Sequence, residues 1–377
     1  MATSRLQQLH DAGVSIWLDF IDRELLTSGR LRRMVESDFV TGETTNPTIF
    51  EKALAEGHEY DDQLSAAGRD LPPAELFELV ETEDVRTACD IFADVYARTN
   101  GGDGYVSIEV SPASANDAEA TVREAQRLWH AVDRPNLMVK VPGTQEGATA
   151  VRQLIGQGIN VNITLLFAIN AHARVIDAYI AGLEDRLRAG SSIDNVASVA
   201  SFFVSRVDTE IDKRLNDLAA TKSGAEREHV LRLRGKAAIA NAKLAYRLFE
   251  AKFSGERWER LAAKGARLQR PLWASTSTKN PEYRDVIYVE ELIGPNTVNT
   301  LPPATLEAFR DHGEVRQTIT QGLDQAQLCL AELEAVGISL EQVTDKLLVD
   351  GLASFQKSFD QLTAGLAKKM SLLVPAS

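Results

Sequence analysis

The chain has 377 residues, of which 44% are hydrophobic and 25% charged, and its formal net charge is −13. A chain of this composition can bury a large core, and its length is ordinary for a barrel that carries extra helices. The acidic balance argues against binding to nucleic acid. The lack of a signal-peptide core, and of any apolar run near the roughly 18 residues of a membrane span, indicates a cytoplasmic protein.

Short runs that favour β-strands alternate with amphipathic helical stretches along the whole chain. The expected strands are Ser15–Phe20, Val40–Asn46, Tyr105–Ser111, Leu137–Pro142, Ile159–Leu165, Val196–Phe203, Pro271–Ser277 and Thr297–Leu301. Helical patterns between them include Ala118–Val132, Gly147–Ile155, Ala171–Leu187 and Thr209–Leu218. This alternation predicts an α/β protein with a parallel sheet. No glycine-rich dinucleotide fingerprint follows the first strand, so a closed (β/α)8 TIM barrel is favoured over an open sheet.

Two helical extensions add to the expected barrel. Arg227–Phe253 is a helical insertion, within about 225–268, before the seventh strand. The C-terminal stretch, about 340–372, repeats apolar residues at steps of four and three: Leu348, Leu352, Phe355, Phe359, Leu362 and Leu366. That face indicates a helix packed on the barrel exterior or one laid partly over the mouth. No linker or repeat divides the chain, so 1–377 are expected to form one domain.

In five of the expected strands, polar residues at alternate positions share one face. Successive side chains of a strand point to opposite faces, so parity assigns each one to the helix side or to the lumen of a barrel. In Asn136–Pro142 the aliphatic residues share one face and Lys140 lies on the other. The same parity places further polar residues in the lumen: Asp19, Thr44, Asn46, Ser107, Glu109, Asn160, Asn162 and Thr164. They lie toward the carboxyl ends of their strands, where barrel active sites are found.

These residue types suit one kind of chemistry. An amine in a partly apolar lumen is desolvated, so a fraction of it is neutral and can attack a ketone. The resulting Schiff base accepts electrons when the neighbouring carbon–carbon bond breaks. Two carboxylates on different strands can serve the dehydration and the cleavage steps separately. The six histidines are scattered, with no metal-ligand spacing, so neither a metal nor a cofactor is expected.

At these residues the sequence resembles the transaldolase family, and the likeness spans essentially the whole chain. Three stretches carry it: G-E-T-T-N-P-T-I-F at Gly42–Phe50, N-L-M-V-K-V-P-G-T at Asn136–Thr144 and G-I-N-V-N-I-T-L-L-F at Gly158–Phe167. The length and S-T-S-T-K-N-P at Ser275–Pro281 are similar to the longer bacterial branch of the family. The resemblance implies a (β/α)8 barrel that uses a lysine Schiff base.

The resemblance also implies a role for each matching residue. Lys140 would be the Schiff-base nucleophile, Glu109 the acid–base group that acts through a water on the imine, and Asp19 the acid–base group at the carbon–carbon step. The implied substrate contacts are Thr44, Asn46, Asn162 and Thr164 around the donor and the bound intermediate, Ser201 on the dihydroxyacetone unit, Phe203 as a water-excluding wall and Arg206 on the acceptor phosphate.

The sequence departs from the family after the seventh strand, where many members carry a second phosphate-binding arginine. Here the chain reads Ser275-Thr276-Ser277-Thr278-Lys279. Lys279 is either a replacement that offers a point charge without bidentate geometry, or a solvated loop lysine.

The implied reaction is reversible transfer of dihydroxyacetone from sedoheptulose 7-phosphate to glyceraldehyde 3-phosphate, which gives erythrose 4-phosphate and fructose 6-phosphate in the non-oxidative pentose phosphate pathway. Two alternatives stay open from the residues: a Schiff-base aldolase that releases free dihydroxyacetone, and a sugar-phosphate-binding barrel without turnover. The expected partners are small sugar phosphates, and the chain is expected to be a monomer or a homodimer.

Overall fold

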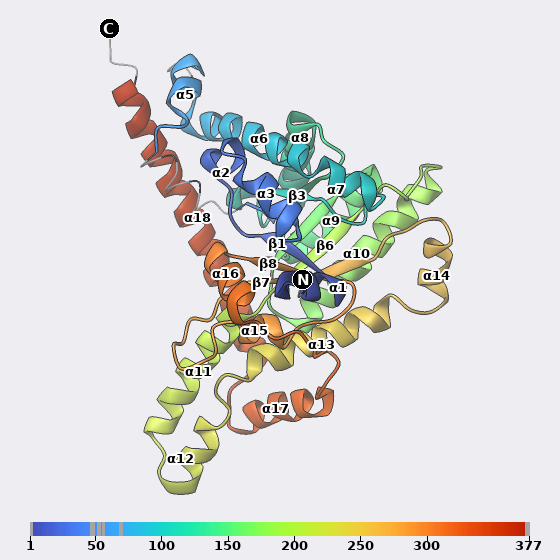
Figure 1. Ribbon diagram of the computed structural model, residues 1–377. Coiled ribbons are helices and arrows are strands. Elements are labelled where there is room, and N and C mark those ends of the chain that lie inside the picture. The colour runs from blue at the N-terminus through green and yellow to red at the C-terminus, as the bar shows by residue number, and fades with distance from the viewer. Residues whose placement is uncertain (1–2, 46–49, 51–53, 55–56, 68–70, 374–377) are drawn as a thin grey trace.

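The computed structural model describes residues 3–45, 50, 54, 57–67 and 71–373, and eight parallel strands lie within them as a closed barrel in sequence order (Figure 1). The strands are β1 (Val14–Leu18), β2 (Val40–Thr44), β3 (Val106–Glu109), β4 (Leu137–Pro142), β5 (Val161–Leu166), β6 (Ser198–Phe203), β7 (Gln269–Ala274) and β8 (Thr297–Leu301). β8 pairs with β1 and closes the barrel. The predicted (β/α)8 fold with additional helices is confirmed.

Helices surround the strands and extend beyond them. In chain order they are α1 (Arg5–Asp11), α2 (Arg23–Thr27), α3 (Arg30–Ser37), α5 (Asp61–Ala67), α6 (Pro73–Ile91), α7 (Ala93–Arg98), the 3-10 turn η1 (Pro112–Ser114), α8 (Ala118–Val132), α9 (Gln145–Gln157), α10 (Ile169–Arg188), α11 (Ser205–Ala220), α12 (Gly224–Leu231), α13 (Ala237–Lys252), α14 (Glu256–Ala262), α15 (Ile287–Glu290), α16 (Pro303–His312), α17 (Leu323–Ala335) and α18 (Leu340–Leu373). No helix in the described part of the chain is long and apolar enough to cross a membrane.

Local signals in the sequence fix several of these boundaries. α8 has the bounds that its pattern predicts, because the Asp117 side chain accepts from the backbone N–H of Ala120 at 2.9 Å and Asp133 leaves the helix with φ 51°. These are a side-chain cap and a left-handed ending. The expected helix at Arg227–Phe253 is two helices, α12 and α13, because the chain between them turns through Gly235 with φ 68°.

The barrel has an apolar outer wall and a lumen that changes character along its axis. Ile108, Val139 and Ile163 are fully buried in the large core between strands and helices. The lower lumen is filled by a separate apolar cluster that includes Trp17, Tyr105, Met138, Val199, Leu272 and Val298. Because the apolar cluster plugs the bottom of the lumen, the polar residues are left at the end formed by the carboxyl ends of the strands.

The long helix α18 runs along the barrel and past the carboxyl ends of the strands (red in Figure 1). Leu362 and Leu366 are buried against the core, while Gly351 and Phe355 line the pocket at the mouth. The helix therefore packs on the barrel exterior and also covers part of the mouth, so both arrangements that its apolar face allows occur together.

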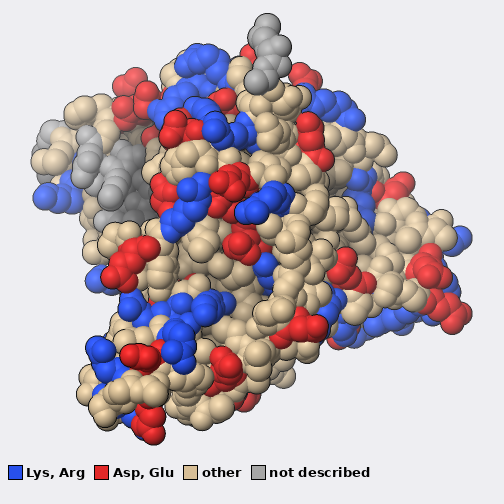
Figure 2. Space-filling model, turned by 60° about the horizontal axis from the view of Figure 1, so that its bottom comes forward, with Lys and Arg blue, Asp and Glu red and all other residues tan. Residues whose placement is uncertain are grey.

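Acidic and basic side chains are interspersed over the face of the molecule that Figure 2 shows. The net charge of −13 therefore does not make that face uniformly negative. A few converging cations can attract an anion despite an acidic total, because the local potential depends on the nearest charges.

Candidate active site

A pocket of about 380 Å³ opens at the carboxyl ends of the strands. Its lining includes Asp19, Phe20, Thr44, Glu109, Lys140, Thr164, Leu165, Ser201, Phe203, Arg206, Ser275, Ser277, Lys279, Thr300, Gly351, Ser354, Phe355 and Ser358. Of the residues that the sequence predicts for the site, all but Asn46 and Asn162 are in this lining. Asn46 lies outside the described residues.

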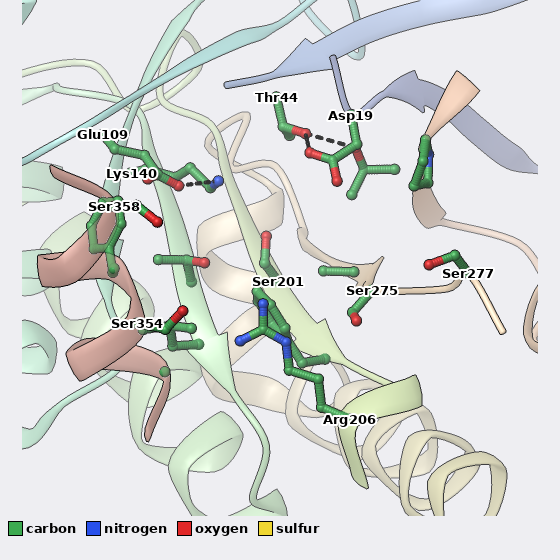
Figure 3. Close-up of a pocket in the computed structure, with 18 of the residues that line it drawn as sticks. Asp19, Thr44, Glu109, Lys140, Ser201, Arg206, Ser275, Ser277, Ser354 and Ser358 are labelled. Carbon is green, nitrogen blue, oxygen red and sulfur yellow. Dashed lines mark hydrogen bonds and ion pairs between the residues drawn. The ribbon is translucent and has the colours of Figure 1, made fainter. Parts of the chain in front are cut away.

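Lys140 and Glu109 form the centre of the pocket. They are neighbours in the register of β3 and β4, and the Lys140 Nζ forms an ion pair with Glu109 Oε1 (Figure 3). Nζ also donates a hydrogen bond to the backbone oxygen of Thr45 at 3.1 Å. Only about a tenth of either side chain is exposed. The amine is therefore held by two short contacts in a nearly dry part of the lumen, with a carboxylate in reach for proton transfer.

Asp19 lies across the pocket from this pair, directly after β1. Its backbone N–H donates to the carbonyl of Leu301 at 2.9 Å, which continues the β1–β8 pairing by one residue. The Thr44 hydroxyl donates to Asp19 Oδ1 at 3.0 Å and lies 2.7 Å from the Thr300 hydroxyl. Strands β1, β2 and β8 thus fix the orientation of the second carboxylate, apart from the first.

Burial shifts both carboxylates toward the protonated form. It raises the pKa of Glu109, and the nearby Lys140 ammonium opposes part of that rise. It also raises the pKa of Asp19, again against the Lys140 charge and the Thr44 hydrogen bond. A carboxyl group with a raised pKa exchanges protons closer to neutral pH, as a general acid or base must.

Asn162 lies in the lumen beside Lys140 in the register of β4 and β5. Its amide nitrogen donates to the Ser107 hydroxyl at 2.9 Å, and its oxygen accepts from the Ser201 hydroxyl at 2.6 Å. It is fully buried. Asn162 therefore links three strands from beneath the pocket and orients Ser201, which does line the pocket.

One end of the pocket is rich in cations and hydroxyls. Arg206, the second residue of α11, stacks over the Phe203 ring at 5.1 Å and is exposed to the mouth. Lys279 Nζ donates to the Ser277 hydroxyl at 2.7 Å. Ser275 has φ 56°, which ends β7 three residues earlier than the expected Ser277 and turns this hydroxyl-rich loop across the pocket.

Some lining residues were missed from the sequence. Ser275 and Ser277 belong to the hydroxyl-rich stretch before Lys279, and that stretch could have pointed to them. Thr300 lies in β8, where polar residues stand on both faces, so parity alone does not single it out. Ser354 and Ser358 come from α18, and nothing in the local sequence distinguishes them from the polar side of any amphipathic helix.

A paired lysine and two separated carboxylates at the carboxyl end of a (β/α)8 barrel define the class of this protein: a barrel enzyme that uses a lysine amine as its nucleophile. Within the described residues, no group of three or more His, Cys, Asp or Glu side chains is placed to hold a metal ion.

The comparisons with known proteins give the family. The model of the transaldolase/fructose-6-phosphate aldolase family matches residues 16–366. A transaldolase of Thermobifida fusca is 48% identical over 370 residues, which cover 98% of this chain and 99% of the relative. A transaldolase of a Parafrankia strain is 50% identical over 95% of each chain, and transaldolase 2 of a Nostoc strain is 46% identical over the full length of both. The chain belongs to the transaldolase/fructose-6-phosphate aldolase family, and its function is that of a transaldolase, a transferase of the pentose phosphate pathway.

Proposed function

We propose that Lys140 carries the transferred dihydroxyacetone unit as a Schiff base, with Glu109 and Asp19 in separate proton-transfer roles. The observation that carries this assignment is the buried ion pair of Lys140 with Glu109, with Asp19 in the same pocket. When the proton of the lysine passes to Glu109, the neutral amine attacks the ketone of the donor. Glu109 then returns the proton, through a water, to the hydroxyl that leaves as water.

Asp19 acts at the carbon–carbon bond. Its carboxylate removes the proton from the hydroxyl next to that bond, the aldehyde product leaves, and the electron pair passes into the imine as an enamine. Attack of the enamine on an acceptor aldehyde reverses these transfers, and the proton on Asp19 goes to the new hydroxyl. Hydrolysis of the imine, with Glu109 as the base, releases the product and restores the lysine.

Arg206 and Lys279 hold the phosphate groups in this proposal. Arg206 lies in the first turn of α11, where backbone N–H groups and the helix dipole also favour an anion. Lys279 lines the same pocket beside Ser277, which supports a role as the second cation over that of a solvated loop residue. The lining hydroxyls of Thr44, Thr164 and Ser201 suit the hydroxyls of a sugar, and Phe203 limits access of water.

The proposed substrates are sedoheptulose 7-phosphate and glyceraldehyde 3-phosphate, with erythrose 4-phosphate and fructose 6-phosphate as products. The relatives named above favour transfer over release of free dihydroxyacetone, and the Lys140–Glu109 pair weighs against a barrel that binds without turnover. We also propose one domain across 1–377, a cytoplasmic location, and a monomer or homodimer that does not bind nucleic acid.

Borohydride trapping tests the nucleophile. Reduction in the presence of fructose 6-phosphate, followed by mass analysis of peptides, should label the peptide of Lys140 and no other. Lys243 is the matched control, because it is also a buried lysine but pairs with Glu291 at 2.9 Å outside the lumen. A label on another lysine, or turnover retained by Lys140→Ala, would overturn the assignment.

A further inference from the structure

A second cavity, called the rear cavity below, adjoins the mouth pocket at Glu109. Its volume is about 770 Å³, and its walls come from α6, α8, the end of β3 and α18. Figure 1 shows α6 and α8 side by side above the barrel. Glu109 and Phe355 line both this cavity and the mouth pocket. The catalytic carboxylate therefore forms part of the partition between two spaces, only one of which receives the substrate.

Acidic side chains outnumber basic ones in the lining of the rear cavity. The charged residues that line it are Glu75, Glu78, Glu81 and Arg86 from α6, Glu124 and Arg127 from α8, and Glu109 from β3, with Lys140 behind Glu109 on β4. The part of α18 that lines the cavity contributes Phe355 and Phe359, which carry no charge. Leu79, 41% exposed, also lines the cavity and connects it to the surface.

Most of these charges already have partners. Glu78 forms an ion pair with Arg127. Glu124 accepts hydrogen bonds from the backbone N–H of Ser111 at 2.8 Å and from the Ser114 hydroxyl at 3.0 Å. Arg86 donates to backbone carbonyls at the end of α8. These groups are engaged in holding α6, α8 and the β3 loop together.

Among the buried charged groups of the cavity, Glu81 is the exception. It is 4% exposed, it lines the cavity, and within the described part of the chain no hydrogen bond or ion pair reaches its carboxyl group. A buried carboxyl without a partner destabilises the fold unless it is protonated or has a use. Burial raises its pKa well above the ordinary value, and among the charges Glu109 adds most to that rise. Glu81 is thus shifted toward the protonated form, in a cavity that it shares with Glu109.

We propose that Glu81 is a positioning residue that exchanges a proton with Glu109 through water in the rear cavity, an inference that rests on the proposed role of Glu109. During imine formation the leaving hydroxyl takes the proton of Glu109. The nitrogen of the intermediate then releases its second proton to the Glu109 carboxylate, and this proton passes along a hydrogen-bonded water to Glu81, where it replaces the proton that Glu81 supplied to Glu109 before the hydroxyl left. Imine hydrolysis reverses the transfer. Glu109 can then change its protonation state while a sugar phosphate fills the mouth.

The cavity suits this role. It is large enough to hold many water molecules, and its carboxylates and backbone groups offer them the two to four polar partners that an ordered water needs. A route through the mouth would instead be closed by the substrate, since Glu109, Phe355 and α18 border the same pocket as Lys140.

The test is Glu81→Gln, with Glu75→Gln as the control, because Glu75 lines the same cavity from α6 but is exposed. The rate of imine formation from fructose 6-phosphate is measured by rapid mixing and borohydride quench, between pH 6 and 9, in H₂O and in D₂O. We expect Glu81→Gln to be about tenfold slower, a smaller loss than the 10²–10⁴-fold typical of a direct acid–base group. Its pH dependence should change and its solvent isotope effect should rise, while Glu75→Gln matches the wild type in both.

Two further variants keep the test decisive. Glu81→Leu removes the proton without leaving an unpaired polar group, so it should fold even if the glutamine variant does not, and it should be equally slow. Glu81→Ala should regain rate when formate is added, because a small acid can enter the cavity from the surface. A pH profile and isotope effect that superimpose on those of the wild type would overturn the proposal. If Glu109→Gln itself forms the imine at the wild-type rate, the proposed role of Glu109 fails instead.

Discussion

Asp19→Asn should separate carbon–carbon cleavage from imine formation with little effect on the fold. The Thr44 hydroxyl donates to Asp19 Oδ1 at 3.0 Å, and an asparagine oxygen can accept the same bond. We therefore expect a change of less than about 1 kcal/mol in the free energy of unfolding, within the range of a single hydrogen bond. The rate of cleavage should fall by about 10²–10⁴-fold, which is about 3–5 kcal/mol of transition-state stabilisation.

The assay distinguishes the two steps by the size of the adduct. The imine should form on Lys140 of the variant from fructose 6-phosphate, and borohydride should trap the intact six-carbon phosphorylated adduct because cleavage is blocked. Glu109→Gln is the contrasting variant, in which the adduct itself should form slowly. Fast accumulation of a three-carbon adduct in Asp19→Asn would refute the division of roles.

The pH dependence offers a second readout on Asp19. Because burial raises the pKa of Asp19, wild-type cleavage should lose rate as the pH falls through a value above the ordinary carboxyl range. The variant should lack that loss, since an asparagine side chain does not titrate there.

Four further outcomes are expected. Arg206→Ala and Lys279→Ala should raise KM for phosphorylated substrates far more than for unphosphorylated analogues, and equal effects on both would remove the residue from the phosphate site. Dialysis against a strong chelator should leave kcat unchanged, and a loss restored by zinc or magnesium would contradict a mechanism based on lysine alone. Burial raises the pKa of Asp208 to about 7, so the folded state binds this proton more tightly than the unfolded chain. The free energy of unfolding should therefore decrease as the pH rises from 4 to 7. In Asp208→Asn, the free energy of unfolding from denaturant titrations should lack this part of its pH dependence. Gly42→Ala would bring a methyl group within 2.5 Å of the buried Trp17 ring. This overpacking should lower the free energy of unfolding, measured by thermal unfolding, by about 1–3 kcal/mol. An unchanged Tm would show that the ring can move.

The strands and the centre of the site could be predicted because their signals are local. Alternation along Leu137–Pro142 fixes both the strand and the face of Lys140, and the strand in the structure has those bounds. The end of β7 could not be predicted, because Ser275 takes a left-handed conformation that its residue type does not favour. Glu81 had no signal either, since it lies among other acidic residues on a helix and only the packing of α6 on β3 and α8 buries it.

Because α18 follows the last strand in the chain, the barrel is complete in sequence before the residues that complete the substrate pocket. The last strand ends at Leu301, whereas Gly351, Ser354 and Phe355 follow some fifty residues later. During synthesis the strands can close while the helix that completes the pocket wall is still inside the ribosome. A chain cut between the two would keep all eight strands and yet lack part of the pocket wall. Ser354 and Phe355 belong to α18 and to no strand, so selection can change the pocket lining there without changing the sequence of any strand.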